Sequence, residues 1–85
     1  MKAHEFDRIV KKLALHTRNT DHIHAWLEYE GRIVVKTKRS HGNKPQPAHH
    51  IRQQLKLNED QISDLVSCTL SRDAYIEILR SKGIL

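Results

Sequence analysis

Two histidines one residue apart carry the strongest chemical signal in the sequence. His22 and His24 flank Ile23, and side chains two positions apart lie on the same face of a strand. A third histidine, His41, follows the next apolar run. Histidine can accept or donate a proton near neutral pH, so these side chains are candidates for acid–base chemistry on a bound anion.

Basic residues surround these histidines and favour an anionic partner. Residues 1–46 contain ten Lys or Arg against five Asp or Glu, whereas residues 47–85 contain five of each. This asymmetry predicts that the first half of the chain binds the anion. RNA fits best, because its phosphates bind cationic side chains and its bases stack on aromatic rings such as Trp26. The predicted RNA-binding residues are Arg18, Trp26, Lys36, Lys38 and Arg39.

The composition sets limits on the class of protein. A chain of 85 residues has room for one domain with a small core. The single cysteine, Cys68, forms no internal disulfide and gives no zinc-binding pattern. No apolar run approaches the roughly 20 residues of a membrane span. We therefore expect a cytoplasmic protein that has no membrane partner and needs no metal or other cofactor.

Apolar periodicity predicts a helix followed by a hairpin. Residues 3–14 have apolar side chains at helical spacing, and a short strand or turn follows at 17–20. The pattern then alternates over 22–29, and Glu30-Gly31 is typical of a tight turn into a partner strand over 33–38. Alternation predicts Ile23, Leu27, Ile33 and Val35 on the face that packs on helices, and His22, His24, Trp26 and Lys36 on the other.

The rest of the chain is predicted to be a loop and three helices. Residues 41–47 form the loop, and Pro47 can begin the next helix. Asn58 and Ser71 are predicted to begin the last two helices. The fold class is therefore α+β, with two layers: a three-stranded antiparallel sheet packed on helices in the order α-β-β-β-α, plus two short C-terminal helices. We expect a core domain over 1–57 and a helical extension over 58–85 packed on it.

The element order, together with the residues at its joints, resembles the HicA toxin family. Members carry a Gly-Ser/Asp-His turn before the second strand, and Thr20-Asp21-His22 stands at the corresponding place here. A Pro-x-His-like element often ends their third strand, where this chain has Lys38-Arg39-Ser40-His41. The segment Pro47–Leu57 is similar to their helix of the pattern Leu-Arg-x-Ile-Leu-Lys-x-x-x-Leu.

This resemblance implies a fold similar to the double-stranded RNA-binding domain and the activity of a small endoribonuclease, an mRNA interferase. It implies metal-independent cleavage of messenger RNA by a histidine on the exposed sheet face, at the position of His22. His24 or His41 would be its complement. The resemblance also implies a cognate antitoxin that covers this face, and control of growth or translation under stress.

Other interpretations of the same residues stay open. One alternative is an RNA-binding module without catalysis. Another is an interaction protein whose C-terminal helices dock a partner, and a homodimer is one such arrangement. A metal site of His22, His24 and His41 is less favoured, because no Cys or acidic ligand joins them at ligand spacing. His49 and His50 are expected to be surface residues, since neighbours in a helix do not share a face.

Overall fold

The computed structural model describes residues 1–42, 45, 47–67 and 69–85. Its elements are α1 (Ala3–Lys12), β1 (His16–Asn19), β2 (Ile23–Tyr29), β3 (Arg32–Arg39), α2 (Ala48–Gln54), α3 (Glu59–Val66) and α4 (Arg72–Ser81). The strands form one antiparallel sheet in the order β1-β2-β3. The predicted α+β fold with the order α-β-β-β-α is therefore confirmed. The predicted loop over 41–47 lies partly, and Cys68 entirely, outside the described residues.

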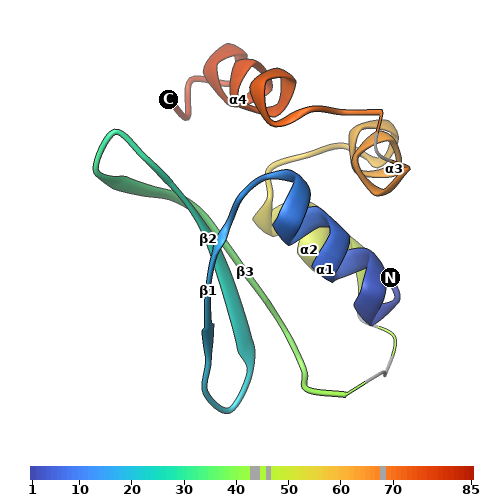
Figure 1. The fold of residues 1–85 in the computed structure, drawn as a ribbon. Helices are drawn as coiled ribbons and strands as arrows, with labels where there is room; N and C mark the ends of the chain where they lie inside the picture. The colour runs from blue at the N-terminus through green and yellow to red at the C-terminus, as the bar shows by residue number, and fades with distance from the viewer. Residues whose placement is uncertain (43–44, 46, 68) are drawn as a thin grey trace.

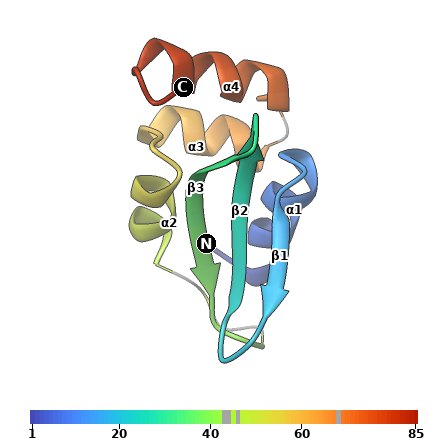
Figure 2. The same cartoon turned by 90° about the vertical axis from the view of Figure 1, so that its left-hand side faces the viewer.

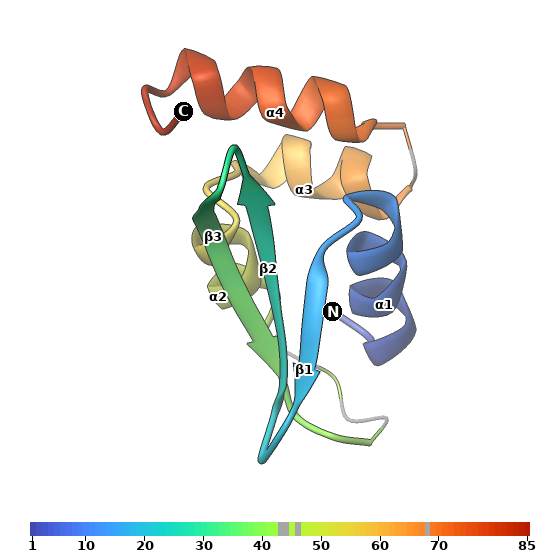
Figure 3. The same ribbon diagram turned by 60° about the vertical axis from the view of Figure 1, so that its left-hand side comes forward.

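The domain has two layers, and one face of the sheet is left open. Helices α1, α2 and α3 lie on one side of the sheet, while α4 runs across the end that carries the β2–β3 turn (Figures 1 and 3). No described helix covers the opposite face, which is turned towards the viewer in Figure 2. We call this uncovered surface the outer face. None of the described helices is long and apolar enough to cross a membrane.

A single apolar cluster holds the two layers together. It draws on every helix and on strands β2 and β3, so residues from both halves of the chain share one core. Burial of these side chains removes apolar surface from water, which is the main favourable term in folding. The largest fully buried side chains of this cluster are those of Phe6, Ile9, Leu13, Leu27, Ile51, Leu55, Leu65, Tyr75 and Leu79.

The last two helices begin at the residues that their capping patterns predict. The Asn58 side chain accepts a hydrogen bond from the Gln61 backbone N–H, and the Gln61 side chain accepts one from the Asn58 backbone N–H. The Ser71 hydroxyl accepts a hydrogen bond from the Ala74 backbone N–H. Both caps satisfy backbone donors that have no partner within the helix.

The β2–β3 hairpin has the predicted turn but also a bulge that the sequence pattern does not predict. Glu30 and Gly31 both have positive φ, as a two-residue turn of this kind requires. Leu27 pairs with Val35, whereas Glu28 pairs with Ile33, so Val34 is an extra residue in β3. The extra residue reverses the side-chain alternation towards the turn. The prediction that Ile33 packs on the helices is therefore wrong: its side chain is 51% exposed and lies on the outer face.

Side-chain hydrogen bonds fasten α4 to the rest of the domain. The Arg72 Nε donates to the Leu13 carbonyl at 3.2 Å, and the Arg80 guanidinium donates to the Tyr29 hydroxyl at 2.6 Å. The buried Tyr75 hydroxyl donates to the Leu55 carbonyl at 2.8 Å. These bonds connect α4 to the end of α1, the hairpin tip and the end of α2.

Replacing Tyr75 with phenylalanine is expected to lower the free energy of unfolding at pH 7 by about 1–2 kcal/mol, because the Leu55 carbonyl loses a buried donor. Burial raises the pKa of Tyr75 above its usual value of 10.0, so the folded state favours the protonated phenol. That contribution is complete below about pH 10 and is lost as the pH rises further. Urea unfolding at pH 7 and pH 11 should show the wild type losing its advantage over Tyr75→Phe; an equal difference at both pH values would contradict this.

Candidate functional site

The outer face presents two cross-strand rows of polar and aromatic side chains. Arg18 of β1 pairs with His24 of β2, which pairs with Lys38 of β3. The second row, two residues further along β2, consists of His16, Trp26 and Lys36. Directly paired residues point to the same side of a sheet, and the alternate residues Ala25, Leu27, Val35 and Thr37 are buried under the helices. The sheet therefore separates its core residues from its polar residues by simple alternation.

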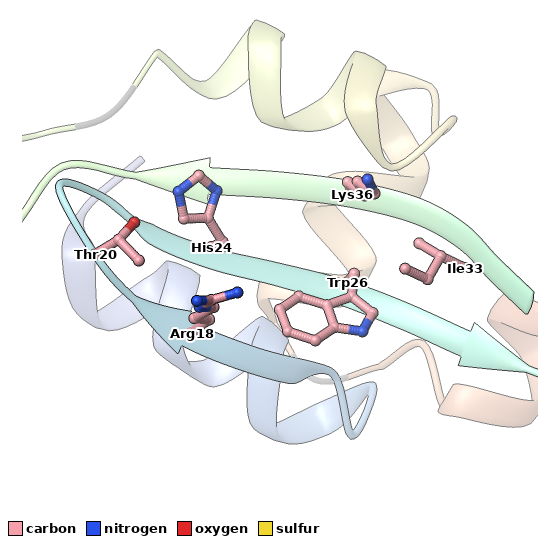
Figure 4. Close-up of a pocket in the computed structure, with 6 residues that line it drawn as sticks. All are labelled: Arg18, Thr20, His24, Trp26, Ile33 and Lys36. Carbon is pink, nitrogen blue, oxygen red and sulfur yellow. The ribbon is translucent and has the colours of Figure 1, made fainter.

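A shallow hollow of about 450 Å³ lies over these rows. We call it the outer hollow. Figure 4 shows its side chains: Arg18 and Thr20 come from β1 and the residue after it, His24 and Trp26 from β2, and Ile33 and Lys36 from β3. An indole and an isoleucine provide an apolar floor, and two cationic groups stand at its margins. Such a surface suits an aromatic base with a phosphate on each side.

Trp26 is held in place by its neighbour in the row. The His16 ring stacks on the indole with centroids 5.8 Å apart and an angle of 19° between the planes. His16 Nε2 lies 3.5 Å from a Glu28 carboxylate oxygen. These contacts restrict the rotamer of an aromatic side chain that is only half-buried, so less entropy is lost when it stacks on a ligand.

The turn between β1 and β2 gathers charge next to the two central histidines. Asp21 Oδ2 lies 3.5 Å from His22 Nδ1, and Asp21 Oδ1 lies 3.9 Å from His24 Nε2. The Thr20 hydroxyl donates to Asp21 Oδ1 at 3.0 Å. This hydrogen bond, with a smaller contribution from the neighbouring His22, lowers the pKa of Asp21. The carboxylate is therefore ionised at neutral pH and can orient either imidazole.

Thr20 stands where the HicA pattern has glycine, and the turn does not require that glycine. The described non-glycine residues with positive φ are Ala14, Glu30 and Lys56. Thr20 is not among them, so its backbone conformation is open to any residue. The Thr20 backbone N–H donates to the His22 carbonyl at 2.9 Å and closes the turn.

The structure brings the three predicted catalytic histidines to one end of the sheet but gives them different surroundings. The rings of His22 and His24 are 6.2 Å apart. β2 begins at Ile23, so His22 lies in the turn and His24 in the strand, within the outer hollow. His41 Nε2 is 2.9 Å from the Thr20 carbonyl oxygen, which holds the segment after β3 against the β1–β2 turn.

His22 lines a second, smaller hollow of about 170 Å³ at the edge between β3 and α2. We call it the edge hollow. Lys38 and His50 line it together with His22. Its remaining described lining residues are Arg39, Ser40, Pro47, Ile51 and Gln54. The Thr37 hydroxyl donates to Gln54 Oε1 at 2.7 Å, which ties α2 to β3 beside this hollow.

Arg39, the fifth predicted RNA-binding residue, lies on the inner side of β3 and is nearly buried. Its guanidinium forms a two-point contact with the Asp7 carboxylate, with Nε–Oδ1 and Nη2–Oδ2 distances of 3.1 and 3.2 Å. Nη1 donates to the carbonyls of Ser40 and Gly42. The guanidinium thus binds groups of the protein itself, and we leave Arg39 out of the RNA-binding face. Its contacts join α1 to β3 and to the segment that follows β3.

Replacing Arg39 with methionine is expected to lower the free energy of unfolding by roughly 2 kcal/mol, because hydrogen bonds of a nearly buried cation are lost. Asp7 is half-exposed and can be rehydrated, which limits the loss. Lys36→Met, on the outer face, serves as the control and should change stability little. Urea unfolding of both variants tests this, and equal stabilities would contradict the assignment of Arg39.

Two residues of the site were not predicted to take part. His16 carries no signal by itself, and only the β1–β2 register places it beside Trp26. His50 is exposed, as expected of a surface residue, but the packing of α2 on β3 places it in the same hollow as His22. Among the described residues, no group of three His, Cys, Asp or Glu side chains is placed to hold a metal ion.

Comparison of the chain with protein-family models, curated proteins and solved structures gives no match. The resemblance to HicA toxins therefore stays a prediction from the sequence. The function has to be argued from the geometry of the outer face and of the histidines at its end.

Proposed function

We propose that this protein binds single-stranded segments of RNA on the outer face and cleaves them as a metal-independent endoribonuclease, as the resemblance to HicA toxins implies. The observation that carries the proposal is the position of His22 and Asp21 in the β1–β2 turn, next to the outer-face row of Arg18, His24 and Lys38. An imidazole next to a carboxylate thus lies beside a surface that suits a sugar–phosphate chain.

The outer face supports RNA binding through charge and stacking. Arg18 on β1, and Lys36 and Lys38 on β3, are exposed cations that flank His24 and Trp26 of β2 on both sides. Phosphate contacts by such cations supply affinity that is independent of sequence and falls with salt. Stacking of an unpaired base on Trp26 adds roughly 1–3 kcal/mol by the usual effect of alanine substitution. A duplex hides its bases in the stack, so this surface favours single strands.

The histidine end supports cleavage through the ribose 2′-hydroxyl. The reaction requires a base for the hydroxyl proton, an acid for the leaving oxygen and positive charge near the phosphate. Asp21 lies next to His22 Nδ1 and favours the tautomer with the proton on that nitrogen, which leaves Nε2 to accept a proton. His22 is thus the proposed base, and a second histidine must be the acid.

RNA binding without cleavage is the second candidate function, and a specific observation favours it. The outer hollow, with Trp26 and Lys36, is larger than the edge hollow that His22 lines. A protein that only binds RNA would need the outer hollow, and its RNA affinity would not depend on His22.

The cognate antitoxin is part of the proposal as the protein partner. The outer face has no cover from the described helices (Figure 2), so a partner seated there would exclude RNA. We therefore expect addition of the antitoxin to block RNA binding and cleavage together.

A cleavage time course in EDTA tests the proposed function. Messenger RNA is incubated with wild-type protein, and His22→Ala protein purified in parallel controls for contaminating nucleases. Cleavage by the wild type alone supports the endoribonuclease. Absence of cleavage by both, with RNA binding that weakens as salt rises, supports the binding module; absence of salt-dependent binding rejects both candidates.

A further inference from the structure

We propose that the edge hollow is the cleavage centre and that His50, rather than His24 or His41, is the acid that completes the proton transfers. This inference rests on the proposed function and adds a residue, a position for the scissile phosphate and a division of roles. Its basis is the convergence of His22, Lys38 and His50 on one small polar hollow.

The three residues come from three separate parts of the chain. His22 lies in the β1–β2 turn, Lys38 near the end of β3, and His50 in the first turn of α2. The packing of α2 against β3, through the Thr37–Gln54 hydrogen bond and the buried Ile51, holds them around the same space. Two imidazoles and an ammonium can supply the base, the acid and the positive charge that cleavage by the 2′-hydroxyl requires.

The other two histidines are less suited to this role. His24 lines the outer hollow, with Trp26 and Arg18, whereas His22 lines the edge hollow. His41 Nε2 is already hydrogen-bonded to the Thr20 carbonyl. His50 shares a hollow with His22, and its described neighbours there leave it open to solvent.

The edge hollow is smaller than the outer hollow, and its cationic and imidazole lining suits a phosphate. Its volume of about 170 Å³ is well under half of the 450 Å³ of the outer hollow. Lys38 lies in the outer-face row of Arg18 and His24 and also lines the edge hollow. An RNA strand can therefore place a base on Trp26 and continue past Lys38 with a phosphate between the two imidazoles.

The reaction balances with these groups alone. His22 Nε2 takes the proton of the 2′-hydroxyl, and the 2′ oxygen forms a bond to phosphorus. The bond from phosphorus to the 5′ oxygen breaks, and that oxygen takes the proton of the protonated His50. Lys38 offsets the charge that builds on the phosphoryl oxygens. The products are a 2′,3′-cyclic phosphate and a 5′-hydroxyl end, and proton exchange with water restores both histidines.

Two substrates distinguish an acid from a residue that only shapes the hollow. One is a short oligoribonucleotide with a single cleavable linkage. The other carries sulfur in place of the 5′ oxygen at that linkage, and a thiolate leaves without being protonated. Single-turnover rates are measured in EDTA for the wild type, His22→Ala, His50→Ala and His49→Ala. His49 is the matched control: its ring contacts that of His50, with centroids 4.1 Å apart, but it lines a different hollow, so His49→Ala measures the effect of losing this contact alone.

With the oxygen substrate, we expect His50→Ala to cleave at least about 100-fold more slowly than the wild type, within the usual range for loss of a proton donor. His49→Ala should stay within roughly three-fold of the wild type. With the sulfur substrate, His50→Ala should recover to within about ten-fold of the wild type, whereas His22→Ala should stay slow, because the base is still needed.

Four results would overturn the inference. If His50→Ala cleaves the oxygen substrate at the wild-type rate, His50 is not the acid. The same holds if His50→Ala cleaves the oxygen substrate slowly and the sulfur substrate does not restore the rate. In both cases the proposed function stands. Absence of cleavage by the wild type rejects both. Products that end in a 3′-phosphate with no cyclic precursor reject attack by the 2′-hydroxyl.

Discussion

Replacing His22 with alanine is expected to lower the rate of RNA cleavage by about two to four orders of magnitude, while RNA affinity changes little. The loss follows from the position of the imidazole, whose Nδ1 is 3.5 Å from Asp21 and whose other nitrogen is left to act as a base. Affinity is retained because the cations of the outer-face rows are untouched. Single-turnover cleavage and equilibrium binding, measured on the same oligoribonucleotide, separate the two effects.

A matched variant controls for the general effect of removing a histidine. His4 is exposed on α1, in the helical layer, and His4→Ala should cleave as the wild type does. Asp21→Asn should retain the base but orient it less well, so cleavage should be slower than in the wild type. Equal cleavage by the wild type and His22→Ala would contradict the assignment of the base; a parallel loss of binding and cleavage would show that His22 serves affinity.

Removing three outer-face cations is expected to produce the largest change in RNA affinity. In the triple variant Arg18→Gln, Lys36→Gln and Lys38→Gln, the slope of log affinity against log salt should become shallower by about two. Each phosphate contact to a single strand contributes roughly 0.7 to that slope. At low salt, affinity should fall by at least about 100-fold. Fluorescence of Trp26, the single tryptophan of the sequence, reports binding at each salt concentration.

A second triple variant separates this effect from net charge. Lys2→Gln, Lys11→Gln and Lys56→Gln remove three exposed cations from the helical side of the molecule. Both variants lose the same formal charge, so long-range attraction falls similarly in both. Only the outer-face variant should show the shallower slope. Equal losses in the two variants would indicate that RNA is attracted by net charge and not bound at the outer face.

Local patterns predicted most of the elements because each depends on nearby residues. The Asn58 and Ser71 caps and the Glu30-Gly31 turn act over three or fewer positions, and the structure has them as predicted. The predicted position of Ile33 was wrong because the bulge at Val34 adds one residue to β3 and not to β2. Nothing in the apolar run Ile33-Val34-Val35 reveals which residue is extra.

Two features of the sequence make opposite predictions for Arg39: alternation along β3 predicts the inner side, and the positive charge predicts exposure. Alternation from the buried Val35 places Thr37 and Arg39 on the same inner side. A cationic residue at the end of a strand is usually exposed, and that general tendency predicts the opposite. Its partner Asp7 lies 32 positions away, and no local pattern connects the two residues.

The convergence of His22 and His50 could not be predicted from the sequence. It depends on where α2 packs along β3, because that position decides which α2 residues lie near His22. Neighbouring residues in a helix point in different directions, so the sequence alone favours neither His49 nor His50. The hydrogen bond between Thr37 and Gln54 fixes the rotation of α2 against the sheet, and this rotation places His50 rather than His49 in the edge hollow.

The open side of the sheet can change its side chains without disturbing the apolar core. Exchanging His16, Arg18 or Lys36 leaves no void among the apolar side chains, because none of the three belongs to the core cluster. Many combinations of side chains at these positions should therefore share one backbone. The outer face can serve as a six-position library, with Arg18, His16, His24, Trp26, Lys36 and Lys38 varied together, from which variants that recognise other ligands are selected.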